Sequence, residues 1–417
     1  MELKRVVVTG LGALSPLGNS VEETWRGMVE GKSGAAPISL FDASVCKTQF
    51  ACEVKNFDLT PILDRKEARK MDRFAHFALW VAKEALEDAK LNLDSEVRER
   101  IGVVWGSGMG GLNSLEENMF DYGRRGGTPM FTPFFIPKVL ISMGAGQISL
   151  YFGLKGPSFA VTSACATSSH AIIQAFDMIR LGRADVVLSG GSGANITVSG
   201  VGGFNAMHAI STRNDSPETA SRPFSKSRDG FVMAEGAACL VLEEYEHAKA
   251  RGAHIYAELA GIGMSSDAYH LTAPDPDGNG ACLVMQLALA DAGIQPEDID
   301  YINTHGTSTP LGDIAELRAI QKVFGEHAYK LNIDSTKSMT GHMLGAAGAI
   351  EALACVKAVE EDIVPPTINH EEGDEDENID YKLNFTFGKA QKRTVRYALS
   401  NTFGFGGHNA ALIFKKI

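Results

Sequence analysis

The sequence has no long apolar run, no paired cysteines and no excess of positive charge, and each absence excludes a class of protein. No stretch of the 417 residues is apolar over the length that a membrane span needs. The start of the chain lacks the secretory pattern of basic residues, long apolar run and cleavage site. The six cysteines include no CxxC pair, which argues against a zinc site or a redox motif, and the net charge of −12 argues against non-specific nucleic-acid binding. We therefore expect a soluble, cytoplasmic protein with reduced thiols and with no membrane or nucleic-acid partner.

Charge is nevertheless concentrated in local clusters. Residues 371–377 form an acidic run, which predicts a solvated loop. Basic residues recur at a spacing of four, which predicts one basic helical face, and a second basic spot follows later in the chain. An ordinary solvated helix face would explain a lone cluster, but on an acidic protein a dense basic face is a better candidate for docking an acidic partner. The first cluster is Arg65, Lys66, Arg69, Lys70 and Arg73, and the second is Arg124 and Arg125.

The sequence alternates short β-prone runs with longer helical ones. Buried strands are predicted at residues 5–9, 101–105 and 184–188, each followed by glycine. Helices are predicted at residues 74–89 and 171–181. This alternation indicates an α/β protein, and a hydrophobic content of 44% is ample for a large core.

The same order of predicted elements occurs twice along the chain. Residues 161–191 are predicted to form a strand, a glycine- and serine-rich turn, an alanine-rich helix and another strand, and residues 331–366 repeat this order. Two further matches support a duplication: residues 105–108 with 303–306, and residues 231–244 with 398–414. We predict two halves, 1–250 and 251–417, with the join near residues 246–254.

The duplication predicts that Cys165 and His342 lie close together. Superposing Ala171–Ile172 on Ala349–Ile350 brings the two residues to within about one position of equivalence. If a pseudo-twofold axis relates the halves, both residues sit at facing helix N-termini in one cleft. A nucleophile and an imidazole would then share a site that neither motif reveals alone.

Cys165 lies in the run Val161–Ile172, at a predicted strand-to-helix junction. The positive end of a helix favours the thiolate, which is the nucleophilic form of cysteine. A small buried hydrophobe is the ordinary interpretation of a single cysteine. Its neighbours along the chain favour the reactive alternative.

Two histidines and a lysine follow predicted strands in the second half. His305 lies in Asn-Thr-His-Gly-Thr-Ser-Thr, and Lys337 precedes Gly-His342. Either histidine alone could be structural, but with Cys165 they predict a site where glycine lets substrate approach the backbone. The glycine-rich run at residues 400–409 lacks the lysine and spacing of a nucleotide loop, so its amides are better suited to an oxyanion.

These four motifs, in this order, resemble those of the condensing enzymes, and most closely the elongating β-ketoacyl-[acyl-carrier-protein] synthases of type II. The motifs are Ser-Ala-Cys165-Ala-Thr, Thr-His305-Gly-Thr-Ser-Thr, Lys337 with Gly-His342, and Asn-Thr-Phe403-Gly-Phe-Gly-Gly. The resemblance extends over essentially the whole chain. It implies the thiolase fold, with five α-β-α-β-α layers built from two duplicated halves, in a homodimer.

The resemblance also implies an acyltransferase that elongates fatty acids by two carbons. Cys165 would take the acyl group from an acyl carrier protein, and His305 and His342, as neutral donors, would stabilise the enolate left when malonyl-carrier protein loses CO2. The amides of Cys165 and Phe403 would form the oxyanion hole, and Phe403 would gate access. Lys337 would act by charge, with Glu351. No organic cofactor is implied.

The remaining implied roles concern substrate binding and docking. Thr307, Thr309 and Thr272 would bind the phosphopantetheine arm, Met109 and Phe204 would line the acyl pocket, and Phe231 would pack near the histidines. The basic residues Arg65, Lys66, Arg69, Lys70, Arg124 and Arg125 would dock the carrier protein, with His208 standing where an arginine is common. A structural cation could be held by the oxygens of Asn303, Glu351, Ser400 and Asn401.

Three other kinds of protein share part of this pattern of motifs. A non-catalytic chain-length factor would lack Cys165. A degradative thiolase would carry a second cysteine near the last glycine-rich turn, where this sequence has Phe403 and His408. A polyketide ketosynthase would share the motifs but act on other acyl chains, and we interpret the compact chain as a free-standing enzyme.

Overall fold

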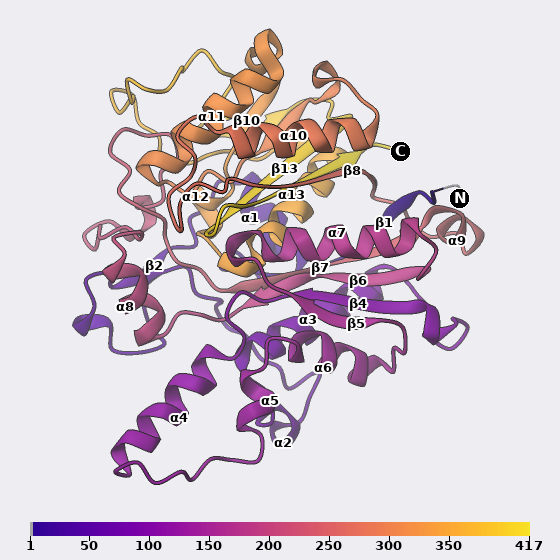
Figure 1. The fold of residues 1–417 in the computed structure, drawn as a ribbon, viewed down its shortest axis with the longest axis vertical. Helices are drawn as coiled ribbons and strands as arrows, with labels where there is room; N and C mark the ends of the chain where they lie inside the picture. The colour runs from indigo at the N-terminus through magenta and orange to yellow at the C-terminus, as the bar shows by residue number, and fades with distance from the viewer. Residues whose placement is uncertain (1–2) are drawn as a thin grey trace.

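A ten-stranded mixed sheet runs through the computed structural model, which describes residues 3–417 (Figure 1). Its strands, in spatial order, are β10 (Asn332–Asp334), β9 (Tyr301–Asn303), β13 (Tyr397–Gly404), β14 (His408–Lys415), β8 (Ala257–Ser266), β1 (Val6–Leu14), β7 (Gly236–Glu244), β6 (Val186–Gly193), β4 (Ile101–Gly106) and β5 (Ser158–Val161). The two small sheets pair β2 (Ala36–Pro37) with β3 (Phe50–Ala51), and β11 (Ile363–Val364) with β12 (Gln391–Lys392).

The large sheet consists of two five-stranded halves with the same connectivity. Outward from the centre, the first half runs β1, β7, β6, β4, β5, and the second runs β8, β14, β13, β9, β10. The halves meet where β1 pairs with β8 at Val6, Val7 and Val8. In each half, the strand that comes first in the chain lies at the centre of the large sheet, and the strand that comes last pairs with it. The strand that comes third in the chain forms the outer edge.

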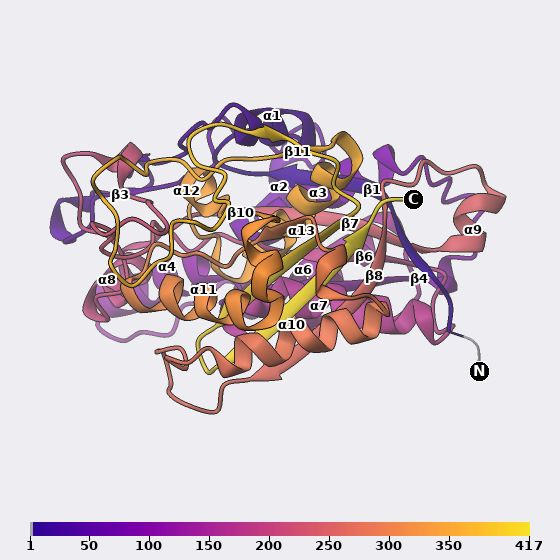
Figure 2. The same cartoon turned by 90° about the horizontal axis from the view of Figure 1, so that it is seen from above.

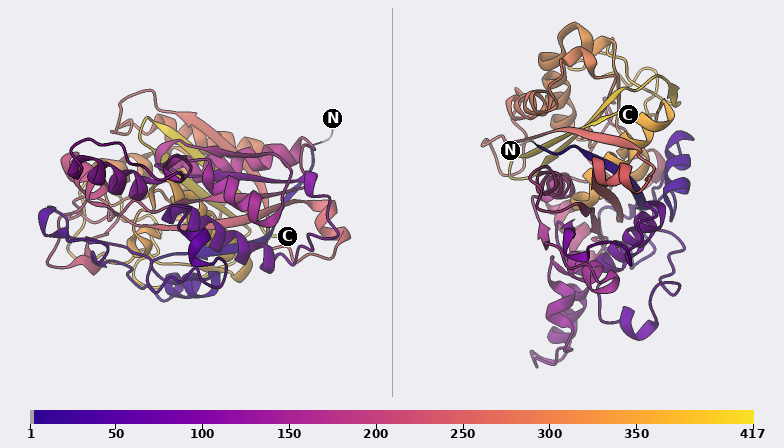
Figure 3. Two further views of the ribbon diagram at one scale, coloured as in Figure 1. Left: turned by 90° about the horizontal axis from the view of Figure 1, so that it is seen from below. Right: turned by 90° about the vertical axis from the view of Figure 1, so that its right-hand side faces the viewer.

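Helices cover both halves and fill the space between them (Figures 2 and 3). α7 (Thr167–Arg180) and α13 (Ala347–Glu361) pack against each other between the half-sheets. α3 (Arg73–Asp88) and α6 (Met143–Phe152) cover the outer face of the first half, while α10 (Asn279–Ala292) and α11 (Pro310–Phe324) cover that of the second. The expected five-layered arrangement is therefore confirmed.

The remaining helices lie at the periphery or at the ends of the strands. They are α1 (Val21–Val29), α2 (Arg65–Ala68), α4 (Leu112–Arg124), α5 (Phe135–Val139), α8 (Val198–Ala206), α9 (Tyr245–Ala250) and α12 (Lys337–Thr340). No helix among residues 3–417 is both long and apolar enough to cross a membrane.

The central helices are buried on nearly every side because each packs between sheet layers. α13 is rich in alanine, which lets neighbouring backbones approach closely, and even its Glu351 is only 1% exposed. A helix that is apolar all round is expected in such a position. The predicted helices of both halves are confirmed, with their ends shifted by a few residues.

One predicted repeat match is wrong. Residues 231–244 do not form a strand, turn and strand, because their regular part is the single strand β7. The hairpin of β13 and β14 corresponds instead to β6 and β7, which also pair antiparallel but are separated by α8 and long loops. The pattern was missed because the two strands of that pair lie far apart in the chain.

The predicted single basic face is also wrong. α2 ends at Ala68, and Asp72 caps the start of α3 by accepting from the amide of Phe74 at 3.2 Å. Arg73 turns inward, with an Nη2 atom 2.6 Å from the buried carboxylate of Glu235. An aspartate at the N-cap starts a new helix, so the repeating basic spacing spans two elements.

The acidic run is only partly a solvated loop. Glu371 and Glu372 are exposed, but Asp376 lies 2.8 Å from the guanidinium of Arg228, and Asp374 accepts from the amide and hydroxyl of Ser227. The run therefore supplies counter-charges for a buried arginine.

Candidate active site

Cys165 lies in a tight turn between β5 and α7. The turn, Ala164–Ala166, begins with Ala164 in the left-handed region at φ 51°, which is uncommon for a residue with a side chain. The hydroxyl of Thr167 fixes the turn by accepting from the amide of Ser163 at 2.8 Å and donating to the carbonyl of Ala164 at 2.6 Å. The predicted strand-to-helix junction is confirmed, and the sulfur is buried with 8% of the residue exposed.

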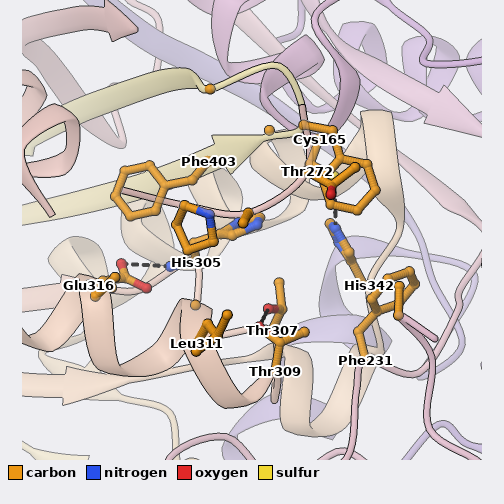
Figure 4. A pocket seen from close by; sticks show the side chains of 18 of the residues that line it. Cys165, Phe231, Thr272, His305, Thr307, Thr309, Leu311, Glu316, His342 and Phe403 are labelled. Carbon is orange, nitrogen blue, oxygen red and sulfur yellow. Dashed lines mark hydrogen bonds between the residues drawn. The ribbon is translucent and has the colours of Figure 1, made fainter. Parts of the chain in front are cut away.

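His305 and His342 come from the second half and meet Cys165 (Figure 4). The Nε2 atom of His342 lies 3.1 Å from the Cys165 sulfur, and the histidine rings lie edge to face with centroids 5.3 Å apart. One ligand-type atom from each of the three residues lies within 4.8 Å of the others. The three predicted residues therefore form one cluster.

Backbone contacts hold each histidine in place. Glu316 accepts from the amides of His305 and Gly306, both at 2.9 Å. The amide of His342 donates to the carbonyl of Val232 at 2.7 Å. Within the described residues, neither Nδ1 atom has a hydrogen-bond partner, so the contact of His342 Nε2 with the Cys165 sulfur is the one that bears on the tautomer of that ring.

The duplicated turn explains how the two halves meet at the site. The turn Leu344–Ala346 precedes α13 as the cysteine turn precedes α7, and Leu344 also has φ 51°. By this match Cys165 corresponds to Gly345, and His342 lies three residues before that position. The predicted near-equivalence of Cys165 and His342 is thus off by about two residues, although their proximity is correct.

Lys337 sets the electrostatics of the cluster. Its ammonium group pairs with Glu351, and both residues are 1% exposed. Burial, and the positive charge of Lys337, hold the pKa of His305 and of His342 well below the ordinary value. Both imidazoles are therefore neutral at physiological pH, as predicted.

Cys165 is not the resting thiolate that its helix position predicts. Burial raises its pKa to about 11, although the charge of Lys337 and hydrogen bonds from the amides of Phe405 and Cys165 act in the opposite direction. Desolvation of the charged form outweighs the helix end and the nearby lysine. The thiol is protonated at rest and lies beside a neutral imidazole.

The amides that point at the sulfur belong to Cys165 and Phe405, whereas the sequence predicts Cys165 and Phe403. Phe403 is the last residue but one of β13, and the centroid of its ring lies 5.8 Å from that of the His305 ring. Phe405 lies in the turn before β14, where Gly406 and Gly407 adopt φ 86° and 74°. In the sequence, the signal for this turn is the position of Phe405 between Gly404 and Gly406.

A cavity of about 500 Å³ opens beside the cluster. It is lined by most of the predicted binding residues, and also by His208, Leu311 and Phe405. The predicted residues in its wall are Phe204, Phe231, Thr272, Thr307, Thr309 and Phe403. The hydroxyls of Thr307 and Thr309 lie 3.0 Å apart in this wall.

Two predicted binding residues lie outside this cavity. Glu351 is buried behind Lys337, and Met109 is 37% exposed at the chain surface. The predicted docking residues Arg65, Lys66, Arg69, Arg124 and Arg125 are exposed, while Lys70 pairs with Glu67 at 2.5 Å.

The four predicted cation ligands are buried, and Glu351 among them pairs with Lys337. Among residues 3–417, one side-chain oxygen of each of the four predicted cation ligands is buried without a hydrogen-bond partner. These residues are Asn303, Glu351, Ser400 and Asn401. Hard oxygens left without partners fit a hard cation.

The fold and the cysteine site together define a thiolase-like acyl-transferring enzyme. Residues 3–248 match the family model for the beta-ketoacyl synthase N-terminal domain, and residues 256–371 match that for the C-terminal domain. The chain belongs to the β-ketoacyl synthase family.

Curated relatives align over the full chain. The protein is 50% identical to 3-oxoacyl-[acyl-carrier-protein] synthase 2 of Coxiella burnetii, covering 100% of both chains. It is 49% identical to the enzyme of the same name from Synechocystis, covering 100% of this chain and 99% of that one.

Solved structures show the same fold. A beta-ketoacyl synthase from Burkholderia phymatum has a TM-score of 0.91 at 36% identity, covering 99% of this chain and 100% of that one. The ishigamide ketosynthase/chain length factor has a TM-score of 0.93 at 34% identity, covering 100% of both. A type II polyketide ketosynthase in complex with its acyl-carrier protein has a TM-score of 0.90 at 34% identity, also covering 100% of both.

Proposed function

We propose that the protein is an acyltransferase that elongates acyl chains on an acyl carrier protein by decarboxylating condensation with malonyl-carrier protein, a 3-oxoacyl-[acyl-carrier-protein] synthase of type II. The observation that carries the proposal is the contact of Cys165 with two neutral histidines in one cavity. Full-length identity of about half to curated synthases of this type supports the choice of reaction.

In the first step, Cys165 takes the acyl group. Its sulfur bonds to the thioester carbon, and the bond from that carbon to the carrier thiol breaks. The thiol proton passes to His342, 3.1 Å away, and then to the leaving thiolate. The amides of Cys165 and Phe405, whose hydrogen bonds act to lower the pKa of the thiol, would also stabilise the oxyanion.

In the second step, malonyl-carrier protein loses CO2 in the same cavity. His305 and His342 donate hydrogen bonds to the thioester oxygen and stabilise the enolate, which requires neutral rings with one N–H each. The enolate carbon attacks the acyl carbon on Cys165, a C–C bond forms, the bond from that carbon to the sulfur breaks, and the sulfur leaves as a thiolate that takes up a proton from water. Burial, together with the fixed charge of Lys337, keeps both rings neutral.

The carrier protein and its arm occupy the exposed side of the site. Thr307 and Thr309 offer paired hydroxyls in the cavity wall, with Thr272 opposite, which suits the amide and hydroxyl groups of phosphopantetheine. The exposed basic residues, chiefly Arg65 and Arg69, suit an acidic carrier. The solved complex of a similar ketosynthase with its acyl-carrier protein supports this kind of partner.

The protein acts as a homodimer built from duplicated chains. The edge strand β5 has exposed Ser158 and Phe159, so a second copy can extend the sheet there. The nearby segment α4–α6 exposes many apolar side chains, which a partner would cover. They include Met119, Phe120, Phe134, Ile136 and Leu150.

Each chain consists of a half that carries the nucleophile, residues 1–250, and a half that carries both histidines and Lys337, residues 251–417. Identical strand connectivity and matching left-handed turns at Ala164 and Leu344 support the duplication. Asn303, Glu351, Ser400 and Asn401 would hold a structural cation, whose role would be to neutralise buried oxygens beside Lys337. The cytoplasmic location expected from the sequence stays a prediction.

Intact-protein mass spectrometry after mixing with hexadecanoyl-acyl carrier protein tests the function. Wild type should gain one hexadecanoyl group, and Cys165→Ala should gain none while keeping its melting temperature. An adduct only from acyl-coenzyme A would favour a thiolase-like enzyme. An adduct only from polyketide intermediates would favour a polyketide ketosynthase, and acylation of Cys165→Ala would refute the assignment of the nucleophile.

A further inference from the structure

The two threonines in the cavity wall stand on either side of Ser308, whose backbone lies in the left-handed region at φ 67°. This conformation is uncommon for a residue with a side chain, and it persists only where the surrounding structure holds it. The hydroxyls of Thr307 and Thr309 lie 3.0 Å apart across this turn (Figure 4). Their spacing therefore depends on the contacts that hold the backbone on both sides of Ser308.

Ser308 itself is held by three hydrogen bonds. Its amide donates to the carboxylate of Asp313 at 3.1 Å, and its carbonyl accepts from the amide of Gly230 at 3.0 Å. Its hydroxyl accepts from the amide of Arg222, also at 3.0 Å. All three bonds end at Ser308, so the chain that follows the turn needs contacts of its own.

Arg228 supplies contacts at the point where the turn runs into α11. Its Nε atom donates to the carbonyl of Thr309 at 3.1 Å, and an Nη atom donates to that of Pro310 at 2.7 Å. The guanidinium pairs with Asp376 at 2.8 Å and with Asp313 at 3.5 Å. Arg228 is 5% exposed and is not part of the cavity lining, so it contacts the threonine segment from the protein interior.

We propose that Arg228 is a positioning residue that holds Thr307 and Thr309 at the spacing that the phosphopantetheine arm requires. A planar guanidinium can bond two neighbouring carbonyls at once, which an ammonium group on a flexible stem does less well. With the two carbonyls fixed, the hydroxyls are ordered before the arm enters, and binding does not have to order them. The inference rests on the proposed acyl transfer and adds a residue that touches neither the arm nor the reacting atoms.

The test uses two octanoyl thioesters that differ in the arm. Octanoyl-pantetheine carries the amides and the hydroxyl of the arm, whereas S-ethyl octanethioate carries none of them. Arg228→Lys keeps a positive charge beside Asp376 and loses the paired carbonyl contacts. It should raise the half-saturating concentration of octanoyl-pantetheine in single-turnover acylation about 10-fold, as expected for two ordinary hydrogen bonds. The maximal rate, and the rate of acylation by S-ethyl octanethioate, should stay as in wild type.

A combination of variants tests whether Arg228 acts through the threonines. Thr307→Ala together with Thr309→Ala should raise the half-saturating concentration of octanoyl-pantetheine by about the same factor of 10. Adding Arg228→Lys to that pair should raise it no further, because residues that act through one contact are not additive. A merely structural role of Arg228 would instead give a further loss.

Ser308→Gly loosens the same turn without touching a buried charge. Glycine adopts the left-handed conformation freely but adopts others as well, so this variant should show the same selective rise for octanoyl-pantetheine. Arg213→Lys is the matched control, because the guanidinium of Arg213 donates to the carbonyl of Ser227 at 2.8 Å instead of to the threonine segment. It should behave as wild type with both thioesters.

Equal losses with both thioesters in Arg228→Lys would show general damage to the fold and overturn the proposal. An unchanged half-saturating concentration of octanoyl-pantetheine would overturn it as well, as would a further loss in the combined variant. If wild type forms no acyl adduct with hexadecanoyl-acyl carrier protein, the proposed function fails, which is a different outcome from the failure of the Arg228 variants alone.

Discussion

At Cys165, burial and position shift the pKa of the thiol in opposite directions. The helix end, Lys337 and two amides favour the thiolate, but desolvation prevails and the pKa rises to about 11. The thiol therefore stays protonated until a thioester arrives and His342 can accept the proton. A resting site of this kind protects the nucleophile from unwanted electrophiles.

This pKa predicts how the free enzyme reacts with iodoacetamide. Because the raised pKa leaves little thiolate at neutral pH, alkylation of Cys165 should speed up about tenfold for each pH unit between 7 and 10. Peptide mass spectrometry would follow Cys165 separately from the half-buried Cys46 and Cys282. A rate for Cys165 that levels off below pH 9 would contradict the raised pKa.

The sequence identifies the reactive residues but not their ionisation. Cys165, His305, His342 and Lys337 stand in motifs whose residue types and order are specific. The direction of the thiol's pKa shift depends on burial between layers that come from both halves, and no local pattern reports that burial. The choice between Phe403 and Phe405 also needed the conformation of a turn whose glycines have positive φ.

At the scale of elements, Gly404 allows the end of β13 to pass against the cysteine turn. A Cβ there would lie 2.7 Å from the carbonyl oxygen of Ser163 and 3.1 Å from the amide nitrogen of Cys165. Backbone atoms in a tight turn cannot give way without moving the nucleophile. Only glycine allows this approach.

Gly404→Ala should therefore slow acylation by hexadecanoyl-acyl carrier protein about 10-fold or more, since it displaces one oxyanion amide. Stopped-flow or quenched acylation would measure the rate. Gly202→Ala in α8 is the matched control, because its Cβ would meet nothing within 4 Å, and it should leave acylation unchanged. Wild-type acylation in Gly404→Ala would show that the two segments can separate freely.

Elements with strong periodicity were predictable, and contacts between distant strands were not. Residues 74–89 and 171–181 have clear helical patterns, and α3 and α7 occupy nearly those ranges. The pair β6 and β7 was missed because long loops separate its strands. The break between α2 and α3 had a local signal in the capping residue Asp72, which a count of basic residues alone overlooks.

At the scale of the whole molecule, the sheet has one conspicuous open edge at β5. Phe159 on this strand is 38% exposed, and exposed apolar side chains lie on α4–α6 nearby. A monomer with such an edge would aggregate, so pairing with a second copy is the expected use of this surface.

Phe159→Glu should weaken self-association, because like charges would face each other across the paired edge strands. Light scattering with size-exclusion chromatography should give twice the chain mass for wild type and a larger monomer fraction for the variant. Leu271→Glu is the control, since Leu271 is 76% exposed and lies on a loop outside this surface. An unchanged dimer in Phe159→Glu would exclude β5 from the interface.

The division of the site between the two halves has a consequence during synthesis. A nascent chain that has reached residue 250 contains Cys165 but neither histidine nor Lys337, and Phe405 is added after all three. The thiol of such a nascent chain therefore lacks its chemical partners until the second half has been made and has folded against the first.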